Sequence, residues 1–370
     1  MTTDTLVRQE IGTAAQPKLQ IVDADVHPYM RSPGDLDPYL SERWQKHRKT
    51  YRENVRRAFA STWVYPRMEN QGNRIDAMPA DGTPAGSNLD LMREQLLDLY
   101  NIEYGILQPL GNAGYVRNPD YSKALCYAMN EWQADAWVAK EPRLKASIVI
   151  NPEYPDDAVA EIERCGTNPA YAQITLPPRA GQPTGNRSYW PIYEAAQHFN
   201  IPLGMHVGGI NGFPSTSGGW PSFYIEEHHS NALTAQSVVT SLVLEGVFEE
   251  FPQLKVIMIE GGFAWVPSLS WRLDKHWNRM RDEVPHVKRP PSEYIKEHIW
   301  FSTQPMEEPP DRQDLKTLID WIGWDRLLFA TDYPHWDFDD PNYAFKFKMS
   351  DEQKQMIYAG NAKNVLRLNS

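Results

Sequence analysis

The stretch Ile21–Pro28, IVDADVHP, is the natural starting point, because Asp23, Asp25 and His27 alternate with apolar residues in what reads as a β-strand. Alternate residues of a strand share one face, so these three side chains are expected to point the same way. Buried polar groups are costly unless a partner satisfies them. A metal ion would be one such partner, since the Cα atoms of Asp25 and His27 should lie roughly 7 Å apart. The alternative is a strand end whose aspartates cap the following turn.

Short apolar runs recur along the chain, and amphipathic stretches lie between them. The alternation of strands and helices predicts an α/β fold with a parallel sheet, and eight such units predict a closed (β/α)8 TIM barrel. No Gly-x-Gly-x-x-Gly motif follows any strand, which makes a dinucleotide-binding doubly wound sheet the weaker interpretation. The predicted strands are 19–28, 102–110, 144–151, 171–178, 201–209, 254–262, 299–305 and 326–334.

A length of 370 residues suits one barrel with insertions. We expect an N-terminal tail at 1–18 and a single domain at 19–370, with long insertions after strands one and five, at 29–85 and 210–228. Both follow C-terminal strand ends, where barrels have their active sites, so we expect both to cover the site. Their aromatic residues indicate a flat, apolar ligand or, equally, packing within a lid: Trp63, Tyr65, Phe213, Trp220, Phe223 and Tyr224.

The composition excludes several classes of protein. The 37 Lys and Arg residues against 48 Asp and Glu residues give a net charge of −11, which argues against a nucleic-acid partner. No apolar run reaches the length of a membrane span or a signal peptide, so we expect no membrane partner and a cytoplasmic protein. The two cysteines, Cys126 and Cys165, cannot form a disulfide framework or a Cys-based zinc site.

Metal-capable side chains gather at the predicted C-terminal ends of three strands. Asp25 and His27 end the first strand, His206 ends the fifth and Asp332 ends the eighth. A single histidine at a strand end is usually a hydrogen-bonded core residue. Barrel closure, however, brings strands eight and one side by side, and carboxylates with neutral imidazoles are donors for Zn²⁺ or Mn²⁺. The combined set therefore predicts one divalent metal ion.

Four motifs together resemble the amidohydrolase superfamily, and more narrowly its aminocarboxymuconate-semialdehyde-decarboxylase-like branch of metal-dependent hydrolases and decarboxylases. They are the D-x-D-x-H strand end, PLGMHVGG, GVFEEFPQLKVIMIEGGFAWVPSLSWRLD and LLFATDYPHWD. The resemblance covers residues 19–367 and is strongest from 200 to 340. It implies one divalent ion held by Asp25, His27, His206 and Asp332, and a homodimer or higher homo-oligomer. Zn²⁺ is the expected ion, and the Asp at the first position keeps Mn²⁺ open.

The sequence departs from the family at the end of strand six, where members often have His-Gly-Gly and this chain has Glu-Gly-Gly starting at Glu260. Glu260 is predicted to accept a proton or to hold a neighbouring group, the alternative being a structural ion pair with Arg272. His228 or His229 is predicted to supply the missing imidazole, although packing at a helix N-terminus would also explain them. The sequence leaves open which of the two faces the site.

Three further residues are weaker candidates. His335 lies three residues beyond Asp332 and is expected to pack within the loop rather than bind the ion. Arg74 and Arg187 lie in long loops and are candidate clamps for a substrate carboxylate, although surface arginines are common.

The reaction follows from the expected site. A divalent ion lowers the pKa of bound water to about 7, and Asp332, with one oxygen free, is the expected proton carrier. Asp23, Asp25, Glu260 and Asp332 together would repel a carboxylate substrate. We therefore predict hydrolysis of an amide, lactone or related bond in a small cyclic or aromatic substrate. The alternative is non-oxidative decarboxylation of an aromatic or related acid; a hydratase and a non-catalytic binding barrel rank lower.

Overall fold

The computed structural model describes residues 19–51, 72–110, 113–178, 180–206 and 218–368. Within them eight parallel strands form one sheet in the order of the sequence, which confirms the predicted (β/α)8 barrel. The strands are β1 (Ile21–Val26), β2 (Ile102–Leu107), β3 (Leu144–Val149), β4 (Tyr171–Thr175), β5 (Leu203–His206), β6 (Val256–Ile259), β7 (Ile299–Ser302) and β8 (Leu327–Leu328).

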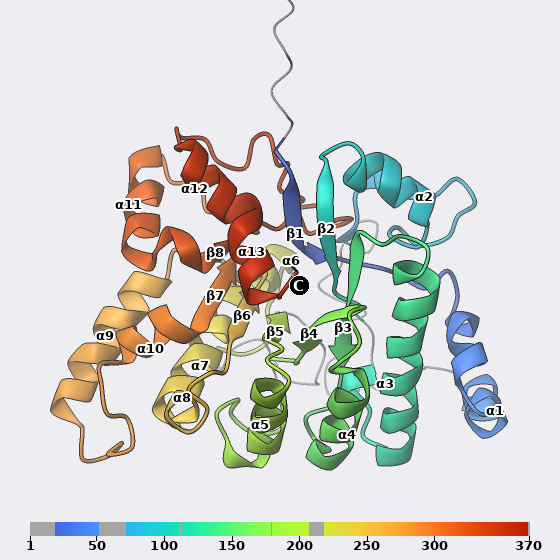
Figure 1. The fold of residues 1–370 in the computed structure, drawn as a ribbon, viewed down its shortest axis with the longest axis horizontal. Coiled ribbons are helices and arrows are strands. Elements are labelled where there is room, and N and C mark those ends of the chain that lie inside the picture. Colours follow the sequence, from blue (N-terminus) through green and yellow to red (C-terminus); the bar gives the residue numbers. More distant parts are fainter. Residues whose placement is uncertain (1–18, 52–71, 111–112, 179, 207–217, 369–370) are drawn as a thin grey trace, which may run out of the picture.

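Helices surround the strands, with α9, α10 and α11 on one side and α1 and α3 on the other (Figure 1). Among the described residues, no helix combines the length and apolar character that crossing a bilayer requires. The helices are α1 (Glu42–Tyr51), α2 (Leu89–Met92), α3 (Pro119–Gln133), α4 (Pro155–Cys165), α5 (Trp190–His198), α6 (Tyr224–His229), α7 (Asn231–Leu244), α8 (Val247–Glu250), α9 (Val266–Arg279), α10 (Pro291–His298), α11 (Arg312–Ile322), α12 (Asp351–Gln355) and α13 (Asn361–Val365).

Backbone hydrogen bonds between the first and last strand regions close the barrel. Ala24 N donates to Phe329 O at 2.9 Å, and His27 N donates to Tyr333 O at 2.8 Å. The same seam carries the amide of Asp332, which donates to Asp25 O at 3.1 Å. Closure therefore brings two of the predicted metal ligands together through the backbone itself.

The barrel interior is packed with apolar side chains. One buried cluster joins residues of five strands with the C-terminal helical segment, and contact between non-neighbouring strands places it inside the barrel. A filled interior leaves the strand ends as the place where polar side chains can converge on a ligand. The buried cluster consists of Val22, Ala24, Ile106, Ala172, Ile257, Ile259, Leu328, Ala330, Ala359, Ala362, Val365 and Leu366.

Several strands are shorter than predicted, because their polar ends leave the ladder. β8 covers two residues where 326–334 was predicted. Glu260 and Asp332 adopt left-handed conformations, with φ of 57° and 64°. Such conformations are unfavourable for residues with a side chain and are found where a turn has to aim that side chain.

The described parts of the two insertions lie in different places. Helix α1 packs beside α3, with the rings of Trp44 and Tyr121 4.9 Å apart. The first insertion reaches the site through Tyr29, whose OH lies 3.0 Å from His335 Nε2. Most of α6 belongs to the second insertion. Residues 52–71 and 207–217, which include Trp63, Tyr65 and Phe213, lie outside the described residues, and a covering role for the two insertions stays a prediction.

Candidate active site

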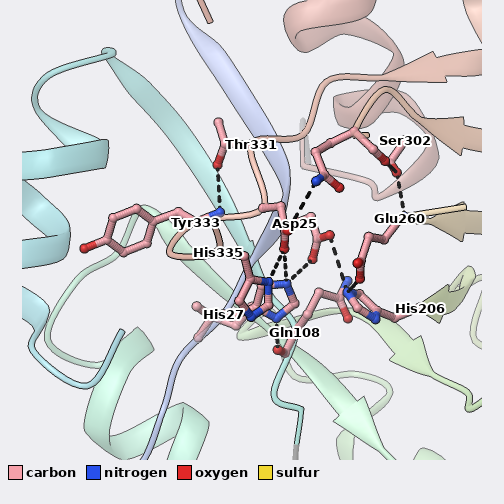
Figure 2. Close-up of polar contacts among 12 residues, drawn as sticks. Asp25, His27, Gln108, His206, Glu260, Ser302, Thr331, Tyr333 and His335 are labelled. Atoms are coloured by element: carbon pink, nitrogen blue, oxygen red, sulfur yellow. Dashed lines mark hydrogen bonds and ion pairs between the residues drawn. The ribbon is translucent and has the colours of Figure 1, made fainter. Parts of the chain in front are cut away.

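The predicted metal ligands lie together at the C-terminal ends of β1, β5 and β8. Asp25, His27, His206 and Asp332 each offer a ligand atom, and these atoms all lie within 4.8 Å of one another. All four residues are buried, three of them completely. Figure 2 shows Asp25 and His27, at the end of β1, facing His206 at the end of β5.

The orientation of His27 suits a metal ligand. Its Nδ1 lies 2.8 Å from Gln108 O, and because a carbonyl only accepts, this nitrogen carries the proton. The lone pair therefore sits on Nε2, which is 3.2 Å from Asp25 Oδ1 and 2.7 Å from Asp332 Oδ1. This arrangement, with one ring nitrogen donating to a carbonyl and the other facing the centre, is the usual one for metal-binding histidines.

The centre has a deficit of positive charge. Neither oxygen of Asp25 has a hydrogen-bond partner among the described residues, and neither has Nε2 of His27. Burial raises the pKa of Asp332 well above its usual value, and the carboxylates of Glu260 and Asp25 raise it further. A divalent cation would satisfy these atoms and remove the repulsion, so the residues fit one divalent ion.

Asp23 does not belong to this centre, although the alternation of β1 predicted that it would share the face of Asp25. Its carboxylate accepts from Thr331 N at 2.9 Å, Thr331 Oγ1 at 2.5 Å and Asp25 N at 3.1 Å. The pairing of β1 with β2 is irregular between Asp23 and Val26, which breaks the simple alternation. Asp23 thus joins β1 to the turn after β8, at the residue that precedes Asp332.

A second polar cluster borders the first and consists of His228, Glu260 and Asp337. Nε2 of His228 lies 3.0 Å from Asp337 Oδ2 and 3.5 Å from Glu260 Oε1. Burial lowers the pKa of His228, but the contacts with Asp337 and Glu260 outweigh burial and raise it to about 10. His228 is therefore an imidazolium at neutral pH, held by two carboxylates.

Glu260 connects the two clusters. Its Oε2 lies 3.1 Å from His206 Nε2, while its Oε1 faces His228. Its backbone N donates to Ser302 Oγ at 3.0 Å, which fixes the turn at the end of β6. The alternative partner Arg272 is exposed. The carboxylate thus takes the place expected for the family's histidine and binds an imidazole from α6.

His335 and Gln304 hold Asp332 in place. His335 Nδ1 lies 2.6 Å from Asp332 Oδ1, and its Nε2 lies 3.0 Å from Tyr29 OH. Gln304 Nε2 donates to Asp332 Oδ2 at 3.2 Å and to Asp337 Oδ2 at 2.9 Å. Both oxygens of Asp332 are therefore engaged, which contradicts the expectation that one remains free to carry a proton.

Other sequence candidates lie away from the centre. His229, next to His228 on α6, is exposed, so the structure brings only the first of the two histidines to the site. Arg74 pairs with Asp76 and stacks on Phe338, and the exposed Arg187 stacks on Trp190. Neither arginine contacts the described residues of the two clusters.

Sequence reasoning assigned no role to several residues that the structure places here. Asp337 and Gln304 were visible as polar residues at strand ends, but their link to His228 depends on the path of α6. Trp336 donates from Nε1 to Tyr224 OH at 3.0 Å, and both rings flank His228. Gln108 follows β2, and nothing in its sequence context signals a functional role.

The family model described as Amidohydrolase matches residues 22–368, nearly the whole chain. The chain belongs to the Amidohydrolase family. This match confirms the superfamily that the four motifs indicated, and the chain is an enzyme of the metal-dependent amidohydrolase superfamily. Relatives named gamma-resorcylate and 2-amino-3-carboxymuconate-6-semialdehyde decarboxylase confirm the branch.

The chain is 28% identical over 298 residues to a gamma-resorcylate decarboxylase of Polaromonas sp., with 75% of this chain and 87% of the relative covered. It is 25% identical over 248 residues to a 2-keto-4-carboxy-3-hexenedioate hydratase of Sphingobium sp., with 60% and 66% covered. A solved structure of dihydroxybenzoic acid decarboxylase from Polaromonas sp., with manganese and the inhibitor 2-nitroresorcinol, superposes with a TM-score of 0.65 at 21% identity, covering 95% of this chain and 98% of that chain.

The prediction of hydrolysis is wrong, because several relatives are named decarboxylases, gamma-resorcylate decarboxylases among them. Asp23 was expected to repel a carboxylate substrate, but its carboxylate is bound to Thr331, and the imidazolium of His228 adds a positive charge beside the centre. The site is therefore less repulsive to a carboxylate than the sequence suggested.

Proposed function

We propose that this protein is a metal-dependent, non-oxidative decarboxylase (carboxy-lyase) of a small aromatic carboxylic acid. The observation that carries the proposal is the pairing of a buried four-ligand centre with an imidazolium that two carboxylates hold beside it. The centre would bind the acid, and the imidazolium would supply the proton that replaces carbon dioxide. The named activity of the Polaromonas relative supports the same reaction class.

We assign the metal to Asp25, His27, His206 and Asp332. Two carboxylates balance a +2 ion, and two neutral imidazoles complete a set of nitrogen and oxygen donors. When bound, the ion supplies Lewis acidity that polarises a substrate oxygen. Mn²⁺ is our choice over Zn²⁺, because half of the donors are carboxylates and the dihydroxybenzoic acid decarboxylase structure contains manganese.

We assign the proton donor to His228 rather than to Asp332. Asp332 Oδ1 faces His27 and His335, and its Oδ2 accepts from Gln304. Nε2 of His228 is the atom that contacts Glu260 and Asp337 among the described residues. We therefore assign Nδ1 as the atom from which the proton leaves toward the ligand. Protonation of the carboxyl-bearing ring carbon forms a C–H bond. The C–C bond then breaks, its electron pair restores the aromatic ring, and carbon dioxide leaves.

Aromatic side chains shape the approach to His228. Its ring lies 5.6 Å from the ring of Trp336 and 5.9 Å from that of Tyr224. Trp336 is half exposed, so one side of this pair remains open. Flat apolar walls beside the proton donor suit an aromatic ring, which stacks or packs edge-on at such distances.

The proposal predicts that Mn²⁺-loaded protein converts an ortho-hydroxybenzoate to the matching phenol with release of one carbon dioxide. A panel of mono- and dihydroxybenzoates, followed by chromatography and carbon dioxide detection, measures this. Removal of the ion with a chelator should stop the reaction, and Mn²⁺ should restore it. Absence of carbon dioxide from every acid of the panel, with the ion present at one per chain, would count against decarboxylation.

Hydration of a carbon–carbon double bond is the second candidate, because one relative is named a hydratase. The centre and His228 would serve it equally well, since both reactions add a proton to carbon. An unsaturated dicarboxylic keto acid that gains one water and keeps all its carboxyl groups would identify this activity by mass.

A further inference from the structure

Gln108 borders the metal centre but is a member of neither cluster. It follows β2 directly, and its backbone N donates to Val26 O at 2.8 Å. Its backbone O accepts from the ring of His27 (Figure 2). The residue is therefore anchored to the metal centre by its main chain, which leaves the side chain free for another task.

The side chain of Gln108 is 99% buried, and its amide is only half satisfied. Oε1 accepts from Thr175 Oγ1 at 3.2 Å, at the C-terminal end of β4. Nε2 has no hydrogen-bond partner among the described residues. A buried amide nitrogen without an acceptor costs about 1–3 kcal/mol, so its persistence calls for an explanation.

In the structure Oε1 is the end of the amide that faces Thr175, so Nε2 is turned away from that contact. Nε2 is therefore an uncharged donor without an acceptor among the described residues. Both residues follow or end strands on the β2–β4 half of the barrel, whereas the metal ligands come from β1, β5 and β8. The Gln108 amide thus lies on a different side of the barrel mouth from the metal ligands.

We infer that Nε2 of Gln108 binds an oxygen substituent of the aromatic ligand, one that the metal ion does not bind. The inference rests on the proposed function for the class of ligand. The carboxyl group of the acid would face the ion. Nε2 of Gln108, next to His27, would then bind an oxygen on a ring carbon adjacent to the one that bears the carboxyl group. Gln108 is then a specificity-determining residue that selects acids with oxygen on both flanking positions.

Equilibrium binding tests this without relying on turnover. The probes are 2-nitroresorcinol and 2-nitrophenol, which differ by one hydroxyl next to the nitro group, titrated calorimetrically into Mn²⁺-loaded protein. Wild type should bind 2-nitroresorcinol about tenfold more tightly. Gln108→Met keeps the shape and the backbone carbonyl but removes the donor, so the preference should fall to about twofold or less. Thr175→Val, which releases the amide, should give an intermediate preference.

Metal content and melting temperature are measured for each variant, so a variant that fails to fold is recognised. If Gln108→Met does not fold, the preference of Thr175→Val tests the inference instead. An unchanged preference in Gln108→Met, an equal loss for both probes, or no preference in wild type would overturn the inference. If the protein decarboxylates an acid of the panel but binds the two probes equally, the role of Gln108 is refuted and the proposed function stands. Discrimination without decarboxylation would do the reverse.

Discussion

Asp332→Asn should lower kcat/KM by about 10³-fold or more and should leave the protein with much less than one bound ion per chain. Asp332 contacts three residues at the centre: its Oδ1 contacts His27 and His335, and its Oδ2 accepts from Gln304. An amide keeps the shape but removes a charge that the cation needs. Kinetics on the best substrate of the hydroxybenzoate panel, with elemental analysis after gel filtration, measure both effects.

Asp337→Asn is the matched control for this prediction. Asp337 also accepts from Gln304, but its other contact is His228 rather than the metal centre. The variant should keep the ion and lose activity only in part, because Glu260 still holds His228. If Asp332→Asn retains both the ion and activity within about tenfold of wild type, the assignment of Asp332 as a ligand fails.

His228→Gln should lower kcat by about 10²- to 10⁴-fold, the range that a positioned general acid contributes. The metal content should stay at the wild-type level, because His228 contacts Glu260 and Asp337 and none of the assigned ligands. Binding of 2-nitroresorcinol should change less than kcat, which separates proton delivery from ligand binding.

The neighbouring histidine provides the control. His229 is exposed on the same helix, so His229→Gln should retain activity within about twofold of wild type. Comparable losses in the two variants would indicate that α6 supports the site only structurally. Loss of the ion from His228→Gln would instead make His228 a ligand.

The barrel and the metal centre could be predicted because both depend on regular features. Strand and helix periods specify eight repeating units, and closure of such a barrel forces the ends of β8 and β1 together. Asp25, His27, His206 and Asp332 therefore converge by topology alone, without any detail of the loops.

The rest depends on local geometry that periodicity does not encode. Asp23 was assigned to the face of Asp25, but the irregular pairing after Asp23 lets its carboxylate bind Thr331. The choice between His228 and His229 depends on the rotation of α6, a helix of six residues with no buried residue to orient it. The error over hydrolysis followed from these two points, since both alter the charge of the pocket.

Anomalous diffraction from Mn²⁺-loaded crystals tests the central claim most directly. The account predicts one strong manganese peak within about 2.0–2.4 Å of His27 Nε2, His206 Nε2 and oxygens of Asp25 and Asp332. A peak bound instead by His228, Glu260 and Asp337, or no peak at either cluster in crystals with full metal content, would contradict it.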